Sequence, residues 1–127
     1  MKTLWVLVLM LAAATAHAHK PSDSYLTLHV DGATLSGQWD IALRDLEFAI
    51  GLDADGDGAI TWGELRARRA DIAAYALARL AVRADGRHCR LSPGAQLVDE
   101  HSDGGYTVLR FDADCGTRAA AALEIEY

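Results

Sequence analysis

Every second residue is apolar along two consecutive segments near the start of the chain. In residues 24–30 the leucines and Val30 share one face, and the alternation resumes over residues 35–43. A period of two is typical of a half-buried β-strand. Between the segments stand Asp31 and Gly32, a pair that accepts the positive φ of a tight turn. The pattern therefore predicts a β-hairpin.

The period changes to that of a helix at Asp45. A short helix is predicted there, because Asp45 and Glu47 are favourable near the positive end of a helix. Its apolar positions are Leu46, Phe48, Ala49 and Ile50. A longer helix is predicted from about Trp62 to Ala81. Its apolar stripe comprises Leu65, Ile72, Tyr75 or Ala76, and Leu80, and its solvent face carries Arg66, Arg68, Arg69 and Arg79.

Turn signals return in the last third of the chain. Asp85-Gly86, Pro93-Gly94 and Asp103-Gly104-Gly105 each predict a reversal. Segments 96–101 and 106–111 flank the last of these and form a predicted second hairpin. Residues 123–127 alternate again, so the chain stops inside an expected strand, which suggests a piece of a longer protein. The fold class expected is α+β: a small β-sandwich-like domain with a helix-loop-helix inserted at about residues 45–81.

The first 18 residues have the pattern of a secretory signal peptide. A basic start with Lys2 precedes an apolar run over residues 4–14, and small residues stand at Ala16 and Ala18. Cleavage after Ala18 leaves an exported domain of residues 19–127, periplasmic or secreted. The run is shorter than the ~20 residues of a membrane span, so no span of the domain's own is expected after cleavage.

The charge balance argues against a nucleic-acid partner. The chain has 12 Lys and Arg against 18 Asp and Glu, a formal net charge of −6. Lys2 is the one charged residue of the leader, so the exported part has a net charge of −7. An acidic domain without a basic patch cannot neutralise phosphates, which supply most of the affinity for nucleic acids.

Two cysteines, Cys89 and Cys115, both lie in the exported part. In an oxidising compartment such a pair is expected to form a disulfide, with two buried thiols as the alternative. Neither cysteine belongs to a C-x-x-C motif, so redox or zinc chemistry has no support there.

Residues 53–64 read DADGDGAITWGE and match the twelve-residue calcium loop of an EF-hand. Calcium requires six to eight oxygen ligands. The expected ligands, at positions one, three, five, seven, nine and twelve, are Asp53, Asp55, Asp57, Ala59 through its carbonyl, Thr61, and Glu64 with two oxygens. Gly58 at position six supplies the sharp turn, and Ile60 at position eight anchors the loop. A solvated acidic turn is the alternative.

Calcium fits the loop better than magnesium does, because magnesium prefers a tight octahedron and retains waters rather than accepting a bidentate glutamate. No second loop of this kind follows in the sequence. A single, unpaired EF-hand in an exported protein is expected to bind calcium weakly, with a Kd on the order of 10⁻⁴–10⁻³ M.

The histidines give weaker signals. Cleavage after Ala18 would make His19 the new N-terminus, whose amine and imidazole can chelate copper. Cleavage after Ala16 would place His19 third, which favours copper or nickel. His29, His88 and His101 show no metal-binding spacing and are expected on the surface or satisfied in the core. No nucleophile elbow or phosphate loop is present, so an enzyme is not predicted.

Several segments resemble a known family. AHKPSDSYL at residues 18–26, GQWDIALRDL at 37–46 and the acidic loop look like the exported N-terminal region of bacterial HupE/UreJ-type membrane proteins. The resemblance implies an extracytoplasmic domain that precedes transmembrane helices in a family linked to nickel handling. Of the site residues, only the loop of residues 53–64 carries over.

The function predicted is non-enzymatic calcium binding in an exported domain, with the ion in a structural role. Two alternatives stay open: a copper- or nickel-binding protein that acts through His19, and an interaction module for a membrane-protein partner. The strand-like ending at residues 123–127 is the sequence support for the interaction module.

Overall fold

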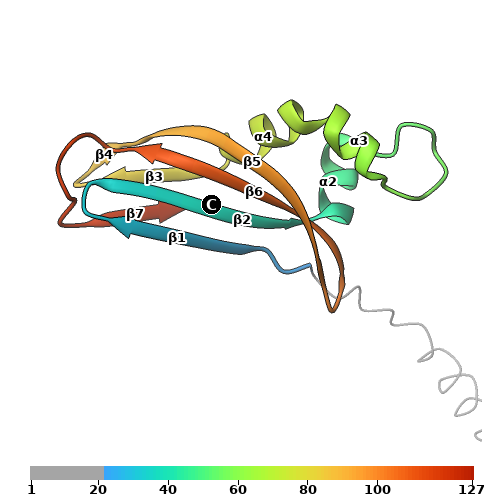
Figure 1. Ribbon diagram of the computed structural model, residues 1–127, viewed down its shortest axis with the longest axis horizontal. Helices are drawn as coiled ribbons and strands as arrows, with labels where there is room; N and C mark the ends of the chain where they lie inside the picture. Colours follow the sequence, from blue (N-terminus) through green and yellow to red (C-terminus); the bar gives the residue numbers. More distant parts are fainter. Residues whose placement is uncertain (1–21) are drawn as a thin grey trace, which may run out of the picture.

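The computed structural model describes residues 22–127 (Figure 1). The expected signal peptide, its cleavage site, and both His17 and His19 lie outside the described residues.

Four strands form the larger sheet, in the order β1-β2-β6-β5, with every neighbouring pair antiparallel. Their bounds are β1 Tyr25–Asp31, β2 Thr34–Ala42, β5 Arg90–His101 and β6 Gly104–Asp114. Both predicted hairpins are confirmed, since β1 pairs with β2 and β5 pairs with β6. The β5–β6 strands are longer than the predicted segments.

The predicted reversal at Pro93-Gly94 is wrong. Both residues lie inside β5, where the pairing with β6 shifts register between Pro93 and Gln96. β5 is at the edge of the sheet. A proline is tolerated on an edge strand because its missing N–H need not serve a ladder bond, and a bulge absorbs the local irregularity.

Three short strands form the second sheet, in the order β4-β3-β7. They are β3 Ala81–Ala84, β4 Arg87–His88 and β7 Leu123–Glu126. The predicted turn at Asp85-Gly86 joins β3 to β4, and both of its residues have positive φ, 49° and 77°. The predicted final strand is β7, which pairs with β3.

The two sheets share one hydrophobic core. From β2 and β6 it takes alternate residues, among them Trp39 and Phe111, and from β3 it takes Val82. Gly37 of β2 leaves room for the Phe111 ring, because a Cβ at Gly37 would lie 2.2 Å from a ring carbon. On the opposite face, Arg110 and Asp112 of β6 are exposed, but Asp40, Tyr106 and Val108 are buried as well. The alternation read from the sequence therefore reports the buried face over only part of each strand.

Three helices lie at one end of the sheets (Figure 1). They are α2 Leu43–Ile50, α3 Trp62–Ala67 and α4 Arg69–Leu77. The single helix expected from Trp62 to Ala81 is therefore wrong in two ways: it is broken at Arg68, and it ends before β3. Arg68 has φ −97° and ψ 8°, and its guanidinium donates a hydrogen bond to the Ile50 carbonyl at 2.9 Å.

The apolar stripe of the helical segment is confirmed, because Leu65, Ile72, Ala76 and Leu80 are all buried. The apolar positions of α2 are only partly correct. Leu46 is fully buried, whereas Phe48 is 96% exposed and Ala49 is also exposed. Phe48 lies two residues from Leu46, which turns it to the far side of a helix with 3.6 residues per turn.

Cys89 and Cys115 form a disulfide, as expected from the sequence. Cys89 precedes β5 and Cys115 follows β6, so the bond ties the two ends of the hairpin together. The α+β class is confirmed by the mixture of helices with antiparallel sheets. Within residues 22–127, no helix is long and apolar enough to cross a membrane.

Candidate metal centre

The acidic loop connects α2 to α3 and projects from the end of the molecule where the helices lie (Figure 1). Its first residue is fixed from α2: the Glu47 carboxylate accepts hydrogen bonds from the backbone N–H groups of Leu52 and Asp53, the second at 2.8 Å. Leu52 is buried at 1% exposure and anchors the start of the loop in the core. The loop therefore begins from a defined point.

Three of the predicted ligands converge. Carboxylate oxygens of Asp53, Asp55 and Asp57 lie within 4.8 Å of one another. Hydrogen bonds from the backbone bend the loop around them: Asp53 accepts from Gly56 at 2.7 Å and from Gly58 at 2.9 Å. The backbone N–H groups of Asp57 and Ala59 donate to Asp55 and Asp57 in turn, at 3.2 and 2.8 Å. A chain of local bonds thus holds the acids on the inner side of the loop.

The loop requires glycine at two positions. Gly56 and Gly58 have φ of +75° and +85°. Residues with a Cβ rarely adopt this region, so the turn that brings Asp53 back toward Gly58 depends on the missing side chain. This agrees with the role predicted for Gly58.

Thr61 and Glu64 form a capping box at the start of α3. The Glu64 backbone N–H donates to the Thr61 hydroxyl at 3.3 Å, and the Thr61 backbone N–H donates to Oε2 of Glu64 at 2.8 Å. The Thr61 hydroxyl donates to the same Oε2, and Oε1 accepts from the backbone N–H of Ala54, each at 2.8 Å. Glu64 is thereby placed beside the first residues of the loop.

Hydrogen bonding keeps two of the candidate ligands ionised. The N–H of Gly58, supported by that of Gly56, lowers the pKa of Asp53, against an opposing effect of desolvation. The backbone N–H of Thr61, with its hydroxyl and the N–H of Ala54, lowers the pKa of Glu64. Desolvation and the negative charge of Asp53 act in the opposite direction on Glu64. Both side chains are therefore ready to accept a cation near neutral pH.

The structure thus brings together part of the predicted ligand set. Asp53, Asp55 and Asp57 form one group, while Glu64 lies outside it, bonded to Ala54 and Thr61. The hydroxyl of Thr61 is engaged by Glu64, and Ala59 contributes its N–H to Asp57. Ile60 packs against the core, as its anchoring role requires.

An apolar groove of about 450 Å³ adjoins the loop. Its lining residues are Leu43, Ile60, Trp62, Leu65, Leu97 and Val98. Trp62 is 45% exposed, whereas Trp39 is buried at 7%. Trp62, the first residue of α3, therefore borders this groove and is partly exposed to solvent.

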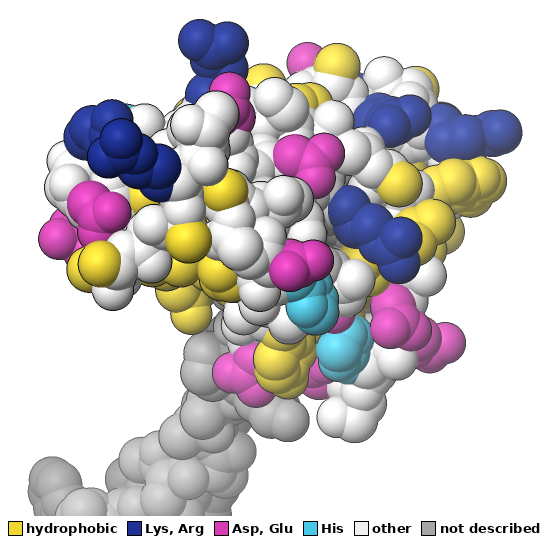
Figure 2. All heavy atoms as spheres, turned by 60° about the vertical axis from the view of Figure 1, so that its left-hand side comes forward, with side chains coloured by type: hydrophobic (Ala, Val, Ile, Leu, Met, Phe, Trp, Pro, Cys, Tyr) yellow, Lys and Arg dark blue, Asp and Glu magenta, His cyan; other side chains and the backbone are white. Residues whose placement is uncertain are grey.

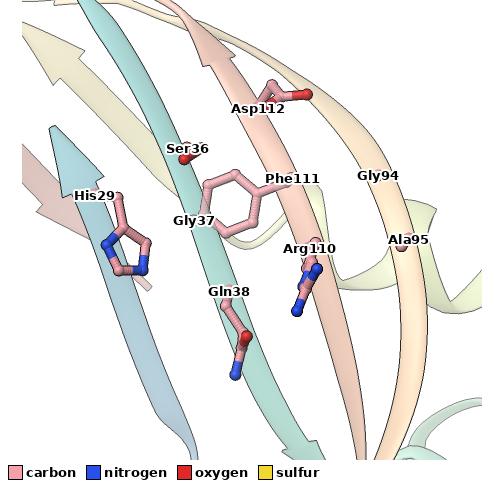
Figure 3. A pocket seen from close by; sticks show the side chains of 9 residues that line it. All are labelled: His29, Ser36, Gly37, Gln38, Gly94, Ala95, Arg110, Phe111 and Asp112. Carbon is pink, nitrogen blue, oxygen red and sulfur yellow. The ribbon is translucent and has the colours of Figure 1, made fainter. Parts of the chain in front are cut away.

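A second hollow, of about 420 Å³, lies on the outer face of the larger sheet (Figure 3). His29, Gln38 and Arg110 come from three neighbouring strands and border it, and Gly94 and Ala95 of the β5 bulge form its other side. In Figure 2, arginine and acidic side chains are interspersed among hydrophobic ones over the face shown. That face carries both signs of charge.

Sequence reasoning did not predict that Asp40 and His101 meet. His101 Nε2 lies 3.3 Å from Asp40 Oδ2, and a carboxylate oxygen of Asp99 lies within 4.8 Å of a ligand atom of each of these residues. The sequence contains one usable signal, since Asp99 and His101 stand two apart on a strand and share its face. The partner on β2 follows only from the strand order.

A comparison with models of protein families found no match, and comparisons with curated proteins and with solved structures found none either. Function must therefore be inferred from the residues of this chain.

Proposed function

We propose that the loop of residues 53–64 binds one calcium ion as the central function of this domain. The convergence of the Asp53, Asp55 and Asp57 carboxylates at the positions of an EF-hand loop carries the proposal. Carboxylates, a carbonyl and a hydroxyl form an oxygen-only donor set, which is the set that a hard cation such as calcium prefers.

The residues would divide the coordination as follows. Asp53, Asp55 and Asp57 donate one carboxylate oxygen each, Ala59 its carbonyl, and Thr61 its hydroxyl or a bridging water. Glu64 adds two oxygens, which brings the total to the six to eight that calcium takes. The Glu64 carboxylate already lies beside Ala54, at the start of the loop. On binding the ion, its oxygens would give up their hydrogen bonds from backbone N–H groups and coordinate the ion instead.

The ion would act on structure rather than on a substrate. Asp53 is fixed to α2 through Glu47, and Glu64 belongs to α3, so one ion held by both would tie the two helices together. A ligand that binds only the folded state stabilises it by RT ln(1 + [L]/Kd), about 1.4 kcal/mol at ten times Kd. The proposal includes no catalytic step.

We place this domain outside the cytoplasm, in the periplasm or secreted. The signal-peptide pattern and the Cys89–Cys115 disulfide support this location, because disulfides persist in oxidising compartments. The resemblance to the exported region of HupE/UreJ-type membrane proteins supports it as well, and points to a membrane-protein partner.

Calorimetry of the oxidised chain at millimolar calcium tests the proposal. Glu64→Gln preserves the size of the side chain but removes a charge and weakens one oxygen donor, so affinity should fall at least tenfold, about 1.4 kcal/mol. Asp55→Asn should weaken binding less, since asparagine is an accepted ligand at position three.

Glu124→Gln is the matched control. It makes the same chemical change on β7, in the other sheet, where Glu124 only approaches Arg83 at 3.9 Å. Its calcium affinity should equal that of the wild type. If the wild type does not bind calcium, or if Glu64→Gln binds as the wild type does, the loop is a solvated acidic turn and the proposal fails.

A further inference from the structure

A second group of metal-ligating side chains lies on the larger sheet, outside the acidic loop. It consists of Asp40 on β2 with Asp99 and His101 on β5. β6 separates the two strands, and the register places all three residues on one face. His101 pairs with Gly104 and Asp40 pairs with Val108, so the two side chains meet diagonally across β6.

Aromatic rings and a hydrogen bond fix the two central side chains. The imidazole of His101 stacks on the ring of Tyr25, with ring centroids 4.9 Å apart and ring planes at 7° to each other. The ring centroid of Tyr106 lies 4.2 Å from that of the imidazole. Gln38 donates to Oδ1 of Asp40 at 2.9 Å, which leaves Oδ2 directed at His101. Outer contacts of this kind orient the ligands in protein metal sites.

The facing atoms of this pair lie at ion-pair distance but form no hydrogen bond. Asp40 is 7% exposed, and the Nε2 atom of His101 is buried without a hydrogen bond. Asp40 Oδ2 lies 3.3 Å from that nitrogen, beyond the 2.7–2.9 Å of a charge-assisted hydrogen bond. A buried polar atom without a hydrogen bond is rare in a folded protein, and each one calls for a physical reason.

We propose that Asp40, Asp99 and His101 bind a divalent transition-metal ion of the zinc class. With metal–ligand bonds of ~2.0–2.1 Å, two ligands of a tetrahedral site are about 3.3–3.4 Å apart, which matches the Nε2–Oδ2 separation. Asp99 is exposed, so its side chain is able to turn inward and supply the third ligand.

The donor set separates this site from the loop. An imidazole nitrogen suits zinc and its neighbours, whereas calcium takes oxygen ligands. Three protein ligands leave one tetrahedral position to water, the arrangement found where a metal stays open to a further ligand. This site is independent of the calcium proposal, because none of its residues belongs to the loop.

Titration of the oxidised chain with Zn²⁺ in a calorimeter tests the inference, with Co²⁺ absorption as a second probe of a nitrogen-containing site. We expect one zinc ion per chain, with affinity at least tenfold lower in His101→Ala. Asp99→Asn, whose exposed site keeps the fold intact, should also weaken binding. Asp40→Asn is a third variant, checked for folding by near-ultraviolet circular dichroism.

Two histidine variants and one loop variant are the controls. His29→Ala removes an exposed imidazole from the same face of the sheet, and His19→Ala removes the candidate chelator at the mature N-terminus. Neither should change zinc affinity, and Glu64→Gln should not change it either. The inference is overturned if the wild type binds no zinc at micromolar concentration. It is also overturned if zinc binding persists in both His101→Ala and Asp99→Asn, or depends on His19 alone.

Discussion

The backbone N–H of Ala54 donates a hydrogen bond to Oε1 of Glu64 across the acidic loop, over 2.8 Å. This bond joins the residue after the first candidate ligand to the first turn of α3. A calcium ion held by both Glu64 oxygens would displace the N–H donors of Ala54 and Thr61. The start of α3 is therefore the part of the structure expected to respond most to the ion.

Trp62 should report calcium binding by a change in fluorescence. It is the first residue of α3, adjoins Thr61, and is 45% exposed, so movement of Glu64 would alter its surroundings. In Trp62→Phe the fluorescence change should vanish while the calorimetric affinity stays as in the wild type. An unchanged spectrum in calcium-bound wild type would mean that α3 does not move.

Gly58→Ala should lower calcium affinity and stability together. At φ +85° a Cβ introduces strain of roughly 1–2 kcal/mol, and the N–H that Gly58 donates to Asp53 would shift. Gly63→Ala is the matched control within α3, where alanine is better than glycine by roughly 0.5–1 kcal/mol. Urea unfolding and calcium titration of both variants test this prediction. If Gly58→Ala and Gly63→Ala change stability and calcium affinity equally, the role of the turn at Gly58 is contradicted.

Loss of the Cys89–Cys115 bond should destabilise the domain by about 3.5 kcal/mol in the chain-entropy model, because the cysteines are 26 residues apart. The Cys89→Ser, Cys115→Ser double variant should unfold at lower urea than the oxidised wild type. Thiol labelling of the unfolded, non-reduced wild type should find no reactive cysteine. Labelling at both positions would contradict the disulfide.

Stability should fall at alkaline pH because of Tyr106. Burial, followed by the hydrogen bond to Asp103, raises the pKa of Tyr106 from 10.0 to about 12. A raised pKa in the folded state contributes stability that is complete below pH 10 and is lost as the pH rises toward about 12.

Tyr106→Phe tests this assignment by urea unfolding across the alkaline range. It should be less stable than the wild type at pH 7 by about 1 kcal/mol, because its hydroxyl bonds to Asp103 and to the Asp23 carbonyl are lost. Its stability should fall less between pH 10 and 12. Parallel curves for the two proteins would show that another group causes the alkaline loss.

Local patterns predicted most of the elements. The hairpins follow from alternation with turn pairs, and the buried positions Leu65, Ile72 and Ala76 follow from helical spacing. The errors arose where distant contacts compete with local preference. Arg68 breaks the predicted long helix while it bonds to Ile50, and Pro93 stays in a strand because that strand is at an edge.

The sequence by itself predicted the candidate calcium site, because all of its candidate ligands lie within twelve consecutive residues. The tertiary structure alone decided that Asp40 and His101 face each other, since they are 61 residues apart and meet only through the order β2-β6-β5. It also decided that Phe48 and Trp62 are exposed. Spacing along the chain fixes local geometry, whereas the burial of a side chain depends on which distant element packs against it.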